Sequence, residues 1–301
     1  MKISAFLCSY GPLFEQGVSV CEVIDRAAAQ GFGAIEPFPC AGLETVDEAR
    51  RVGAYIRDKG LAVSCYSTGC ELLGPDSAAV LAQMRHRIDQ AAAMGSPYFH
   101  HTIHPPLVLP RRGEADFAQS LVRAVPLVRE LCFYAADRGV LCVYEDQGMC
   151  FNGCGAFRRL AEALGDAPFG VVADVGNICF VDETAEQFIG HFSSRIVHVH
   201  LKDYLRKPGN GPCPGAGWYV TRAGDYLRDT IAGHGVVNFP AVFRLLAQIG
   251  YDGWYSLEYA AMEPISFGIG MSVDNLRRYY EDVRRNPVQL PLLDSISPRF
   301  E

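Results

Sequence analysis

The sequence predicts an α/β protein built as a single (β/α)₈ TIM barrel with eight parallel strands, and three observations support this fold class. Short apolar runs alternate with longer stretches of helical spacing from one end of the 301-residue chain to the other. Gly follows six of the helical stretches, where a helix needs a left-handed closing residue before the next strand. Near-continuous apolar strands separated by helices imply a parallel sheet covered on both faces, and eight such units fit a closed barrel better than an open sheet.

The predicted strands are short runs of apolar residues. In chain order they cover residues 3–9, 34–38, 61–67, 97–102, 140–146, 169–175, 196–203 and 253–259. The predicted helices have apolar faces at helical spacing, and they cover residues 18–30, 46–59, 77–94, 114–138, 154–164, 182–194, 239–249 and 272–285. The closing glycines are Gly31, Gly60, Gly95, Gly139, Gly165 and Gly250. No linker that would mark a second domain interrupts this repeat.

Two segments fall outside the repeat. Residues 204–237 are rich in Gly and Pro and form a long insertion after the seventh predicted strand. Structureless loops of this length in compact domains are usually functional or disordered. We expect a lid or pocket wall, with a disordered surface loop or a loop used for subunit contact as the alternatives. We expect residues 1–285 to form the barrel and residues 286–301 a C-terminal tail, which docks loosely or reaches a neighbouring subunit of a homo-oligomer.

The composition is that of a soluble globular protein, with 49% hydrophobic and 20% charged residues. The net charge of −7 and the isoelectric point near 5.6 leave no basic field for a phosphate backbone, which argues against a nucleic-acid partner and against membrane-surface binding. The first residues, MKISAFLCSYGP, are too short and polar a run for a signal peptide or a spanning helix.

The eleven cysteines are an odd number, and most sit inside apolar runs. They are typical of small, reduced core residues in a cytoplasmic protein. Only Cys150 and Cys154 form a close pair, and this pair lacks the second half that a structural zinc site needs.

Polar side chains stand where four of the predicted strands end. These residues are Glu145, Asp174, His200 and Glu258. Because the carboxyl ends of barrel strands meet at one mouth, we expect the four side chains to converge. Ionised carboxylates that converge repel one another unless a cation compensates them. The set therefore predicts one divalent metal ion, with Mn²⁺ preferred and Mg²⁺, Co²⁺ or Zn²⁺ as alternatives.

Further histidines and one glutamate lie near the same predicted mouth. His198 precedes His200 by two residues and so points to the same side of its strand one layer deeper, which favours a hydrogen-bonded interior group over a ligand. His100, His101 and His104 follow the fourth strand, and His101 is the preferred substrate contact among them. Glu36 either faces the mouth or caps the turn that follows its strand, and the sequence leaves both readings open.

At this point the chain resembles a known family, the xylose isomerase-like sugar phosphate isomerase/epimerase superfamily. The segments that carry the resemblance are GFGAIEPF, VYED, ADVGN, HVHLKD and GYDGWYSLEY, in this order. The resemblance extends from residue 2 to about residue 285, and its most specific parts are HVHLKD and GYDGWYSLEY.

The resemblance implies one metal held by Glu145, Asp174, His200 and Glu258, with Glu145 and Glu258 also acting as an acid/base pair. It further implies that Arg206 contacts substrate, although a surface-loop role fits Arg206 equally well. One departure matters, because many epimerases of the family carry Asp-x-x-His where this chain has Asp174 followed by Asn177. Asn177 can hydrogen-bond a substrate hydroxyl but cannot act as an acid or base.

The sequence therefore predicts a metal-dependent isomerase or epimerase that acts on a keto-sugar or polyol through an enediolate. Loss of a β-hydroxyl from the same enediolate would instead make the protein a dehydratase of an inosose or related keto-polyol. A barrel that only binds a sugar, or that serves as a subunit of a larger complex, is the third reading. The chain has no Gly-rich phosphate cradle, which favours a neutral sugar, an inositol derivative or an aldonate as the small-molecule partner. The family also contains C-glycoside-cleaving enzymes and a branch of DNA-repair endonucleases, and the acidic charge argues against the latter.

Overall fold

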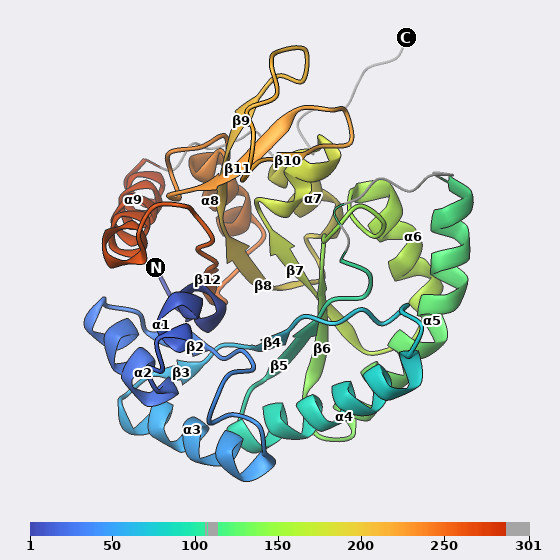
Figure 1. Ribbon diagram of the computed structural model, residues 1–301, viewed down its shortest axis with the longest axis vertical. Coiled ribbons are helices and arrows are strands. Elements are labelled where there is room, and N and C mark those ends of the chain that lie inside the picture. Colours follow the sequence, from blue (N-terminus) through green and yellow to red (C-terminus); the bar gives the residue numbers. More distant parts are fainter. Residues whose placement is uncertain (106, 108–113, 287–301) are drawn as a thin grey trace.

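The computed structural model describes residues 1–105, 107 and 114–286. Its parallel strands form a central sheet that is rolled into a barrel, and the helices surround it (Figure 1). Residues 287–301 of the predicted tail lie outside the described residues. No helix in the described ranges is long and apolar enough to cross a membrane.

The sheet contains nine strand segments in the spatial order β3-β2-β1-β12-β8-β7-β6-β5-β4. All neighbours in it are parallel. The segments are β1 (Ile3–Phe6), β2 (Ala34–Glu36), β3 (Ala62–Val63), β4 (Tyr66–Thr68), β5 (Tyr98–His101), β6 (Leu141–Glu145), β7 (Phe169–Asp174), β8 (Ile196–Leu201) and β12 (Tyr255–Leu257). The predicted TIM-barrel fold class is confirmed.

The third predicted strand, residues 61–67, is divided into β3 and β4, and the sheet closes through this segment. β3 pairs with β2, whereas β4 pairs with β5. Between the paired parts, the backbone N–H of Ser64 donates to the Ile35 carbonyl at 2.9 Å, and that of Ser67 donates to the Pro37 carbonyl at 3.0 Å. The eight predicted strands therefore correspond to the nine observed segments.

The helices begin and end largely where local chemistry places them. The N-cap Ser19, Thr45 and Thr184 each form a capping box, which supplies partners for backbone N–H groups at the start of the helix. The six predicted closing glycines all have a positive φ, between 60° and 83°. The helices are α1 (Gly11–Glu15), α2 (Val20–Ala29), α3 (Val46–Asp58), α4 (Ser77–Met94), α5 (Glu114–Ala136), α6 (Cys154–Leu164), α7 (Ala185–Phe192), α8 (Phe239–Gln248) and α9 (Ile265–Arg285), with 3₁₀ turns η1 (Leu7–Tyr10) and η2 (Asn177–Val181).

Three helices differ from the prediction. α1 was not predicted, and α9 starts at Ile265 rather than at residue 272. α7 is shorter than the predicted span 182–194, because Thr184 caps it at one end and Asp182 adopts a left-handed conformation just before it. Asp182 is the C-cap of η2, the 3₁₀ turn that begins three residues after Asp174.

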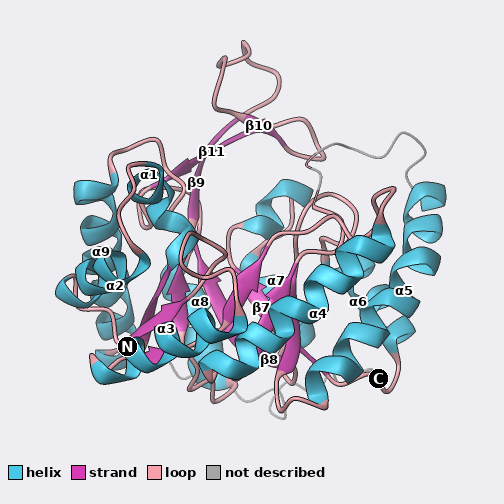
Figure 2. Cartoon of the chain, turned by 60° about the horizontal axis from the view of Figure 1, so that its bottom comes forward, coloured by secondary structure: helices cyan, strands magenta, loops and turns pink. Residues whose placement is uncertain are grey.

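The insertion after β8 is a small antiparallel sheet rather than a structureless loop. Its strands are β9 (Asp203–Lys207), β10 (Tyr219–Val220) and β11 (Tyr226–Thr230), in the order β10-β11-β9. β9 follows β8 after a single residue, so this sheet continues beyond the carboxyl end of β8, and Figure 2 shows it standing above the barrel. The Asp203 carboxylate anchors its base by accepting hydrogen bonds from the backbone N–H groups of Gly233, Gly235 and Val237.

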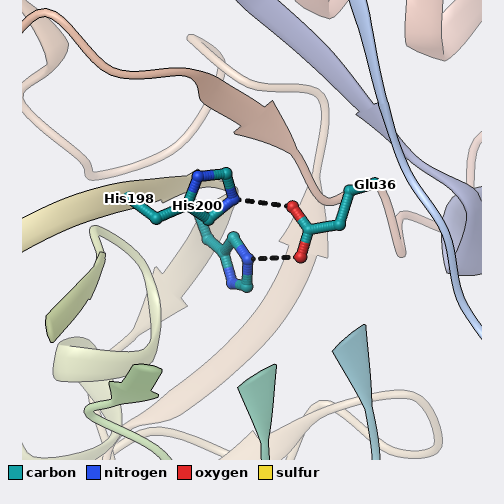
Figure 3. Close-up of side chains that lie close together, drawn as sticks. All are labelled: Glu36, His198 and His200. Atoms are coloured by element: carbon teal, nitrogen blue, oxygen red, sulfur yellow. Dashed lines mark hydrogen bonds and ion pairs between the residues drawn. The ribbon is translucent and has the colours of Figure 1, made fainter. Parts of the chain in front are cut away.

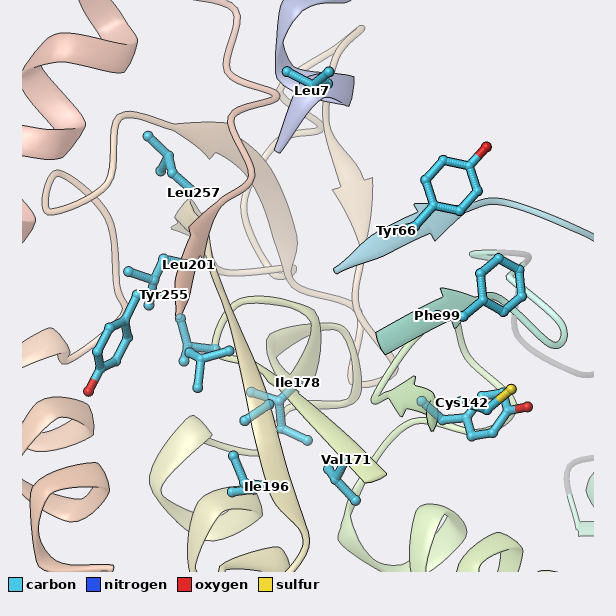
Figure 4. Close-up of a cluster of buried hydrophobic side chains, with 14 of the residues drawn as sticks. Leu7, Tyr66, Phe99, Cys142, Val171, Ile178, Ile196, Leu201, Tyr255 and Leu257 are labelled. Atoms are coloured by element: carbon cyan, nitrogen blue, oxygen red, sulfur yellow. The ribbon is translucent and has the colours of Figure 1, made fainter. Parts of the chain in front are cut away.

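The main core lies between the barrel strands and the surrounding helices (Figure 4). A separate, small apolar cluster of Cys65, Val143 and Val172 lies in the barrel interior. Side chains two residues apart point to the same face of a strand, so Glu145 and Asp174 lie on the same faces as Val143 and Val172, one layer closer to the mouth. On β6 and β7 the barrel interior is therefore apolar below and ionisable above.

Candidate metal centre

Glu145, Asp174, His200 and Glu258 converge at the carboxyl ends of four neighbouring strands. Glu145 and Asp174 are the last residues of β6 and β7, His200 is near the end of β8, and Glu258 directly follows β12. Each side chain offers one ligand atom, and the four atoms all lie within 4.8 Å of one another. Two ligands of one metal ion can be no farther apart than two bond lengths, about 4–5 Å, so this spacing fits a single ion.

The His200 ring is held with one nitrogen towards the three carboxylates. Its Nδ1 atom lies 2.8 Å from Glu145 Oε2, 3.7 Å from Glu258 Oε2 and 3.8 Å from Asp174 Oδ2. Burial alone would lower the pKa of His200, but the charges of Glu36 and Glu145 raise it well above its usual value. Without a metal ion at the site, the neighbouring carboxylates thus favour the protonated form of the imidazole.

Glu36 orients this ring from the other side. One of its carboxylate oxygens lies 3.0 Å from His200 Nε2 and the other lies 2.7 Å from His198 Nε2 (Figure 3). Ser67 also donates its hydroxyl to Glu36. Burial would raise the pKa of Glu36, yet the two imidazoles hold it well below its usual value. A carboxylate that binds the second nitrogen of a metal-ligating histidine fixes the direction of the first nitrogen, and Glu36 is placed to do this.

The structure decides the role of Glu36, which the sequence left open, and places His198 in the interior position expected for it. Glu36 faces the barrel interior and does not cap the turn after its strand, because both of its oxygens bind the imidazoles of β8. His198 lies one layer below His200 and bonds to Glu36. Glu36, His198 and His200 also lie close enough to hold an ion among themselves. However, the Glu36 oxygens are already taken up by three donors, so the four-residue group above them fits an ion better.

Asp174 presents one oxygen to the backbone and the other to the site. Its Oδ1 atom accepts hydrogen bonds from the backbone N–H groups of Gly176 at 2.9 Å and Asn177 at 2.8 Å. Its Oδ2 atom is buried and forms an ion pair with the Lys202 ammonium. Burial raises the pKa of Asp174 to about 6, with Glu145 and Glu258 adding to the rise and Lys202 opposing it. A buried carboxylate that offers an oxygen atom close to the other ligand atoms is suited to a metal ligand.

Lys202 is a member of the site that the sequence reasoning missed. Its ammonium lies 2.8 Å from Glu258 Oε1, 3.1 Å from Asp174 Oδ2 and 3.1 Å from Asn177 Oδ1. Burial would lower the pKa of Lys202, but Asp174 and Glu258 raise it well above its usual value. Because Lys202 follows His200 by two residues, the alternation that placed His198 below His200 also places Lys202 above it, so the signal was present.

Glu145 and Asp146, which are neighbours in the chain, have pKa values that are shifted in opposite directions. Burial would raise the pKa of Glu145, but His100, His200 and Lys202 lower it to about 2. The pKa of the neighbouring Asp146 is well above its usual value, because burial and the charges of Asp174 and Glu145 favour its protonated form. The centre thus gathers more carboxylates than its protein cations balance, and a divalent ion fits this deficit.

A pocket of about 180 Å³ opens beside the centre. Its floor includes Asn177, Lys202 and Glu258 from the barrel, and its wall includes Tyr204, Tyr219 and Asp229 from the insertion. The insertion therefore forms a side of the pocket that adjoins the candidate metal ligands.

The three residues predicted to bind substrate differ in their surroundings. Asn177 lines the pocket, and its Nδ2 atom is buried without a hydrogen-bond partner among the described residues. His101 is engaged within the protein, with Nε2 at 3.0 Å from the Tyr144 hydroxyl and Nδ1 at 2.9 Å from the Thr102 carbonyl. Arg206 is held by Asp182 at 2.6 Å and Asp225 at 2.8 Å.

His100 is closer to the centre than His101. Its Nε2 atom lies 3.6 Å from Glu145 Oε1, and neither ring nitrogen has a hydrogen-bond partner among the described residues. Burial lowers the pKa of His100, and the charge of the nearby Glu145 carboxylate opposes this shift. The sequence named both histidines, and the register of β5 decides which of them faces the site.

Comparison with known families matches residues 24–282 to the family described as xylose isomerase-like TIM barrel. The chain belongs to this family. Among curated relatives, an inosose dehydratase of Geobacillus thermodenitrificans is 29% identical over 127 residues, covering 41% of this chain and 42% of the relative. A putative L-ribulose-5-phosphate 3-epimerase of Escherichia coli is 29% identical over 170 residues, covering 55% of this chain and 51% of the relative. The chain thus aligns with about half or less of these relatives.

Solved structures share the fold at low sequence identity. A xylose isomerase domain protein from Planctomyces limnophilus superposes with a TM-score of 0.73 at 16% identity, covering 94% of this chain and 99% of the other. A 3-keto-D-glucoside 4-epimerase from E. coli superposes with a TM-score of 0.69 at 18% identity, covering 92% and 99%. A xylose isomerase-like TIM barrel protein from Mycobacterium smegmatis, solved with magnesium, superposes with a TM-score of 0.65 at 17% identity, covering 87% of each chain. An enzyme that acts on sugars is the coarse assignment that these relatives support.

Proposed function

We propose that the protein is a metal-dependent isomerase or epimerase that acts on a keto-sugar or polyol through an enediolate, with Glu145 and Glu258 as its acid/base pair. The observation that carries this proposal is the placement of the two glutamates. In the barrel, β7 and β8 lie between β6 and β12, so Glu145 and Glu258 approach Asp174 and His200 from opposite sides. Two proton-transfer groups on opposite sides of one substrate position can remove a proton from one face and return it to the other.

Glu145, Asp174, His200 and Glu258 would hold the metal, and Mn²⁺ is the preferred ion, with Mg²⁺, Co²⁺ or Zn²⁺ as alternatives. When bound, a divalent ion polarises a substrate ketone and makes the adjacent C–H group more acidic. The spacing of the ligand atoms and the excess of carboxylates over protein cations support such an ion.

The protein's own residues provide the proton transfers and the orientation. Glu258 faces the pocket and is oriented by Lys202, so it can remove a proton from a substrate bound there. Glu145 lies on the far side of His200 and can return the proton, and the two roles exchange in the reverse reaction. The unpaired amide nitrogen of Asn177 can donate a hydrogen bond to a substrate hydroxyl in the same pocket. His101 and Arg206 remain proposed substrate contacts, and each would first have to leave its present partners.

A dehydratase is the second candidate, because an inosose dehydratase is among the curated relatives. In that reaction the same proton abstraction would be followed by loss of a β-hydroxyl as water. The Lys202 ammonium, which lies at the pocket floor, could then protonate the leaving oxygen.

Product analysis distinguishes the candidates. The metal-loaded protein would be incubated with ketohexoses and inososes and the products followed by proton NMR. An isomerase or epimerase gives a stereoisomer or a shifted carbonyl at constant mass, whereas a dehydratase gives a product lighter by one water. Binding without either change, in protein that holds one metal ion per chain, would leave a sugar-binding barrel as the remaining function.

A further inference from the structure

The insertion brings an additional carboxylate, Asp229, to the pocket opposite the barrel residues. Asp229 lies on β11 directly across from Tyr204 on β9, so both side chains project from the same face of the small sheet. Both residues line the pocket, together with Lys202 and Glu258 at its floor. Asp229 belongs to a different layer of the structure from the four candidate metal ligands.

The Asp229 carboxylate is half-buried at the pocket, and its own backbone N–H is the hydrogen-bond donor recorded for it within the described part of the chain. Nearby carboxylates of the insertion are differently placed, because Asp225 is bonded to Arg206 and Asp203 accepts several backbone N–H groups. An ionised carboxylate can accept about four hydrogen bonds, so Asp229 keeps capacity to accept further hydrogen bonds from a ligand in the pocket.

The charged residues that line the pocket favour a ligand that carries no negative charge. Among the described lining residues, the charged side chains are Lys202, Asp229 and Glu258. Lys202 is already paired with Asp174 and Glu258. Arg206, on the adjacent strand, is paired with Asp182 and Asp225. Within this part of the chain, no unpaired cation faces the pocket to receive a phosphate or carboxylate.

We infer that Asp229 is a specificity-determining residue that accepts hydrogen bonds from hydroxyl groups of an uncharged polyol and excludes phosphorylated or carboxylated analogues. The inference rests on the proposed function and narrows its substrate class to neutral keto-polyols. Burial and the charge of Glu258 raise the pKa of Asp229 to about 6, with Lys202 opposing, so the carboxylate is ionised near pH 7. An ionised carboxylate accepts hydroxyl hydrogen bonds strongly and repels a like-charged substrate group.

The test compares neutral and anionic ligands in the Mn²⁺-loaded full-length protein. The neutral probes are D-fructose, D-tagatose and scyllo-inosose, and the anionic probes are D-fructose 6-phosphate and D-gluconate. Turnover, or deuterium exchange from solvent, gives kcat and KM, and calorimetry gives binding whether or not turnover occurs. The variants are Asp229→Asn and Asp229→Lys. The control is Asp252→Asn, which removes one charge at the exposed opposite end of the β12 strand.

We expect the wild-type protein to prefer the neutral probes. Asp229→Asn should raise the KM or Kd for the best neutral probe by about 10- to 100-fold, which is the usual effect of losing a hydrogen bond to a charged group. The value of kcat should change much less. Asp229→Lys should shift the ratio of neutral to anionic binding towards the anions, and Asp252→Asn should change neither property.

Three results would overturn the inference. These are wild-type preference for an anionic probe, unchanged affinity in Asp229→Asn at preserved metal content, and absence of binding by every neutral probe. The first two leave the proposed isomerase chemistry intact. Failure of that chemistry shows itself differently, as binding of neutral probes that depends on Asp229 without exchange or turnover.

Discussion

Replacing Lys202 with Met should destabilise the metal-free protein much more than the metal-bound protein. The Lys202 ammonium is buried and lies 2.8 Å from Glu258 and 3.1 Å from Asp174. Met has a similar length and volume but no charge, so Lys202→Met removes the cation with little change in packing. Two carboxylates then face each other without their protein cation.

The magnitude follows from the burial of this pair. Removing one partner of a buried ion pair typically costs about 3–5 kcal/mol, because the other charge is left uncompensated. For a domain of this size, about 2 °C of melting temperature corresponds to 1 kcal/mol of unfolding free energy. In EDTA the Lys202→Met variant should therefore melt about 6–10 °C below the wild-type protein. A divalent ion at Glu145, Asp174, His200 and Glu258 would compensate the same carboxylates. With saturating Mn²⁺ the deficit should therefore shrink to less than half.

The assay is thermal unfolding of both proteins in EDTA and in saturating Mn²⁺, followed by circular dichroism. The matched control is Lys2→Met, which removes a lysine from the exposed pair with Asp252 and should change the melting temperature little in either condition. A Lys202→Met deficit of equal size with and without Mn²⁺ would show that Lys202 and the metal do not share carboxylates. That result would refute the placement of the ion beside Lys202.

Three further predictions test the acid/base pair, the insertion and the pocket carboxylate. Glu145→Gln and Glu258→Gln should each lower kcat by on the order of 100-fold or more, whereas Asp174→Asn should mainly weaken metal binding. Near-normal turnover by either glutamate variant with metal bound would refute the acid/base assignment. Replacing residues 208–217 with a brief Gly-Ser link should raise KM or lower kcat at unchanged metal content and melting temperature, and unchanged kinetics would exclude a lid. The pKa of Asp229 rises from 3.8 to about 6 on folding, so its ionisation opposes folding at neutral pH. Asp229→Asn should therefore raise the free energy of unfolding above pH 6 by at most about 3 kcal/mol, and this gain should disappear below pH 4. Urea unfolding at several pH values measures the gain, and a gain independent of pH would contradict this reasoning.

The barrel itself was predictable because its signal is distributed along the whole chain. Each strand is short, apolar and followed by a helical stretch, and glycines such as Gly31 and Gly139 adopt the left-handed conformation that their positions predicted. The division of residues 61–67 into β3 and β4 was not predictable, because the sequence pattern does not show which backbone hydrogen bonds between neighbouring strands are missing where the barrel closes. The start of α9 was missed because its first turns are half-exposed and weakly periodic.

The sheet formed by the insertion was missed because its strands carry only a weak alternating pattern. Burial along β9 falls from Asp203 to Lys207 without alternating, and in β11 a buried residue between half-buried neighbours occurs only at Leu227. The Gly and Pro residues between these strands dominated the interpretation of the segment as a loop. Its role as a wall of the pocket also depends on a fold in which β9 directly continues β8, which the sequence alone does not show.

Within the site, the sequence identified the residues at strand ends but not the contacts between them. Alternation along β8 placed His198 below His200, and the same rule would have added Lys202. The role of Glu36 could not be decided from sequence, because its contact with His200 joins residues 164 positions apart. Asp229 reaches the pocket only through the register of β11 against β9, and no local pattern indicates this pairing.

The central claim is that one metal ion at Glu145, Asp174, His200 and Glu258 supports proton exchange at a carbon next to a substrate ketone. Its most direct test is proton NMR of ketohexoses and inososes in D₂O with protein titrated from the metal-free form with Mn²⁺. The account predicts deuterium incorporation at one such carbon that rises to a plateau at one ion per chain and is lost in Glu145→Gln and Glu258→Gln. Exchange that persists without metal, or its absence across the panel when one ion is bound per chain, would contradict the claim.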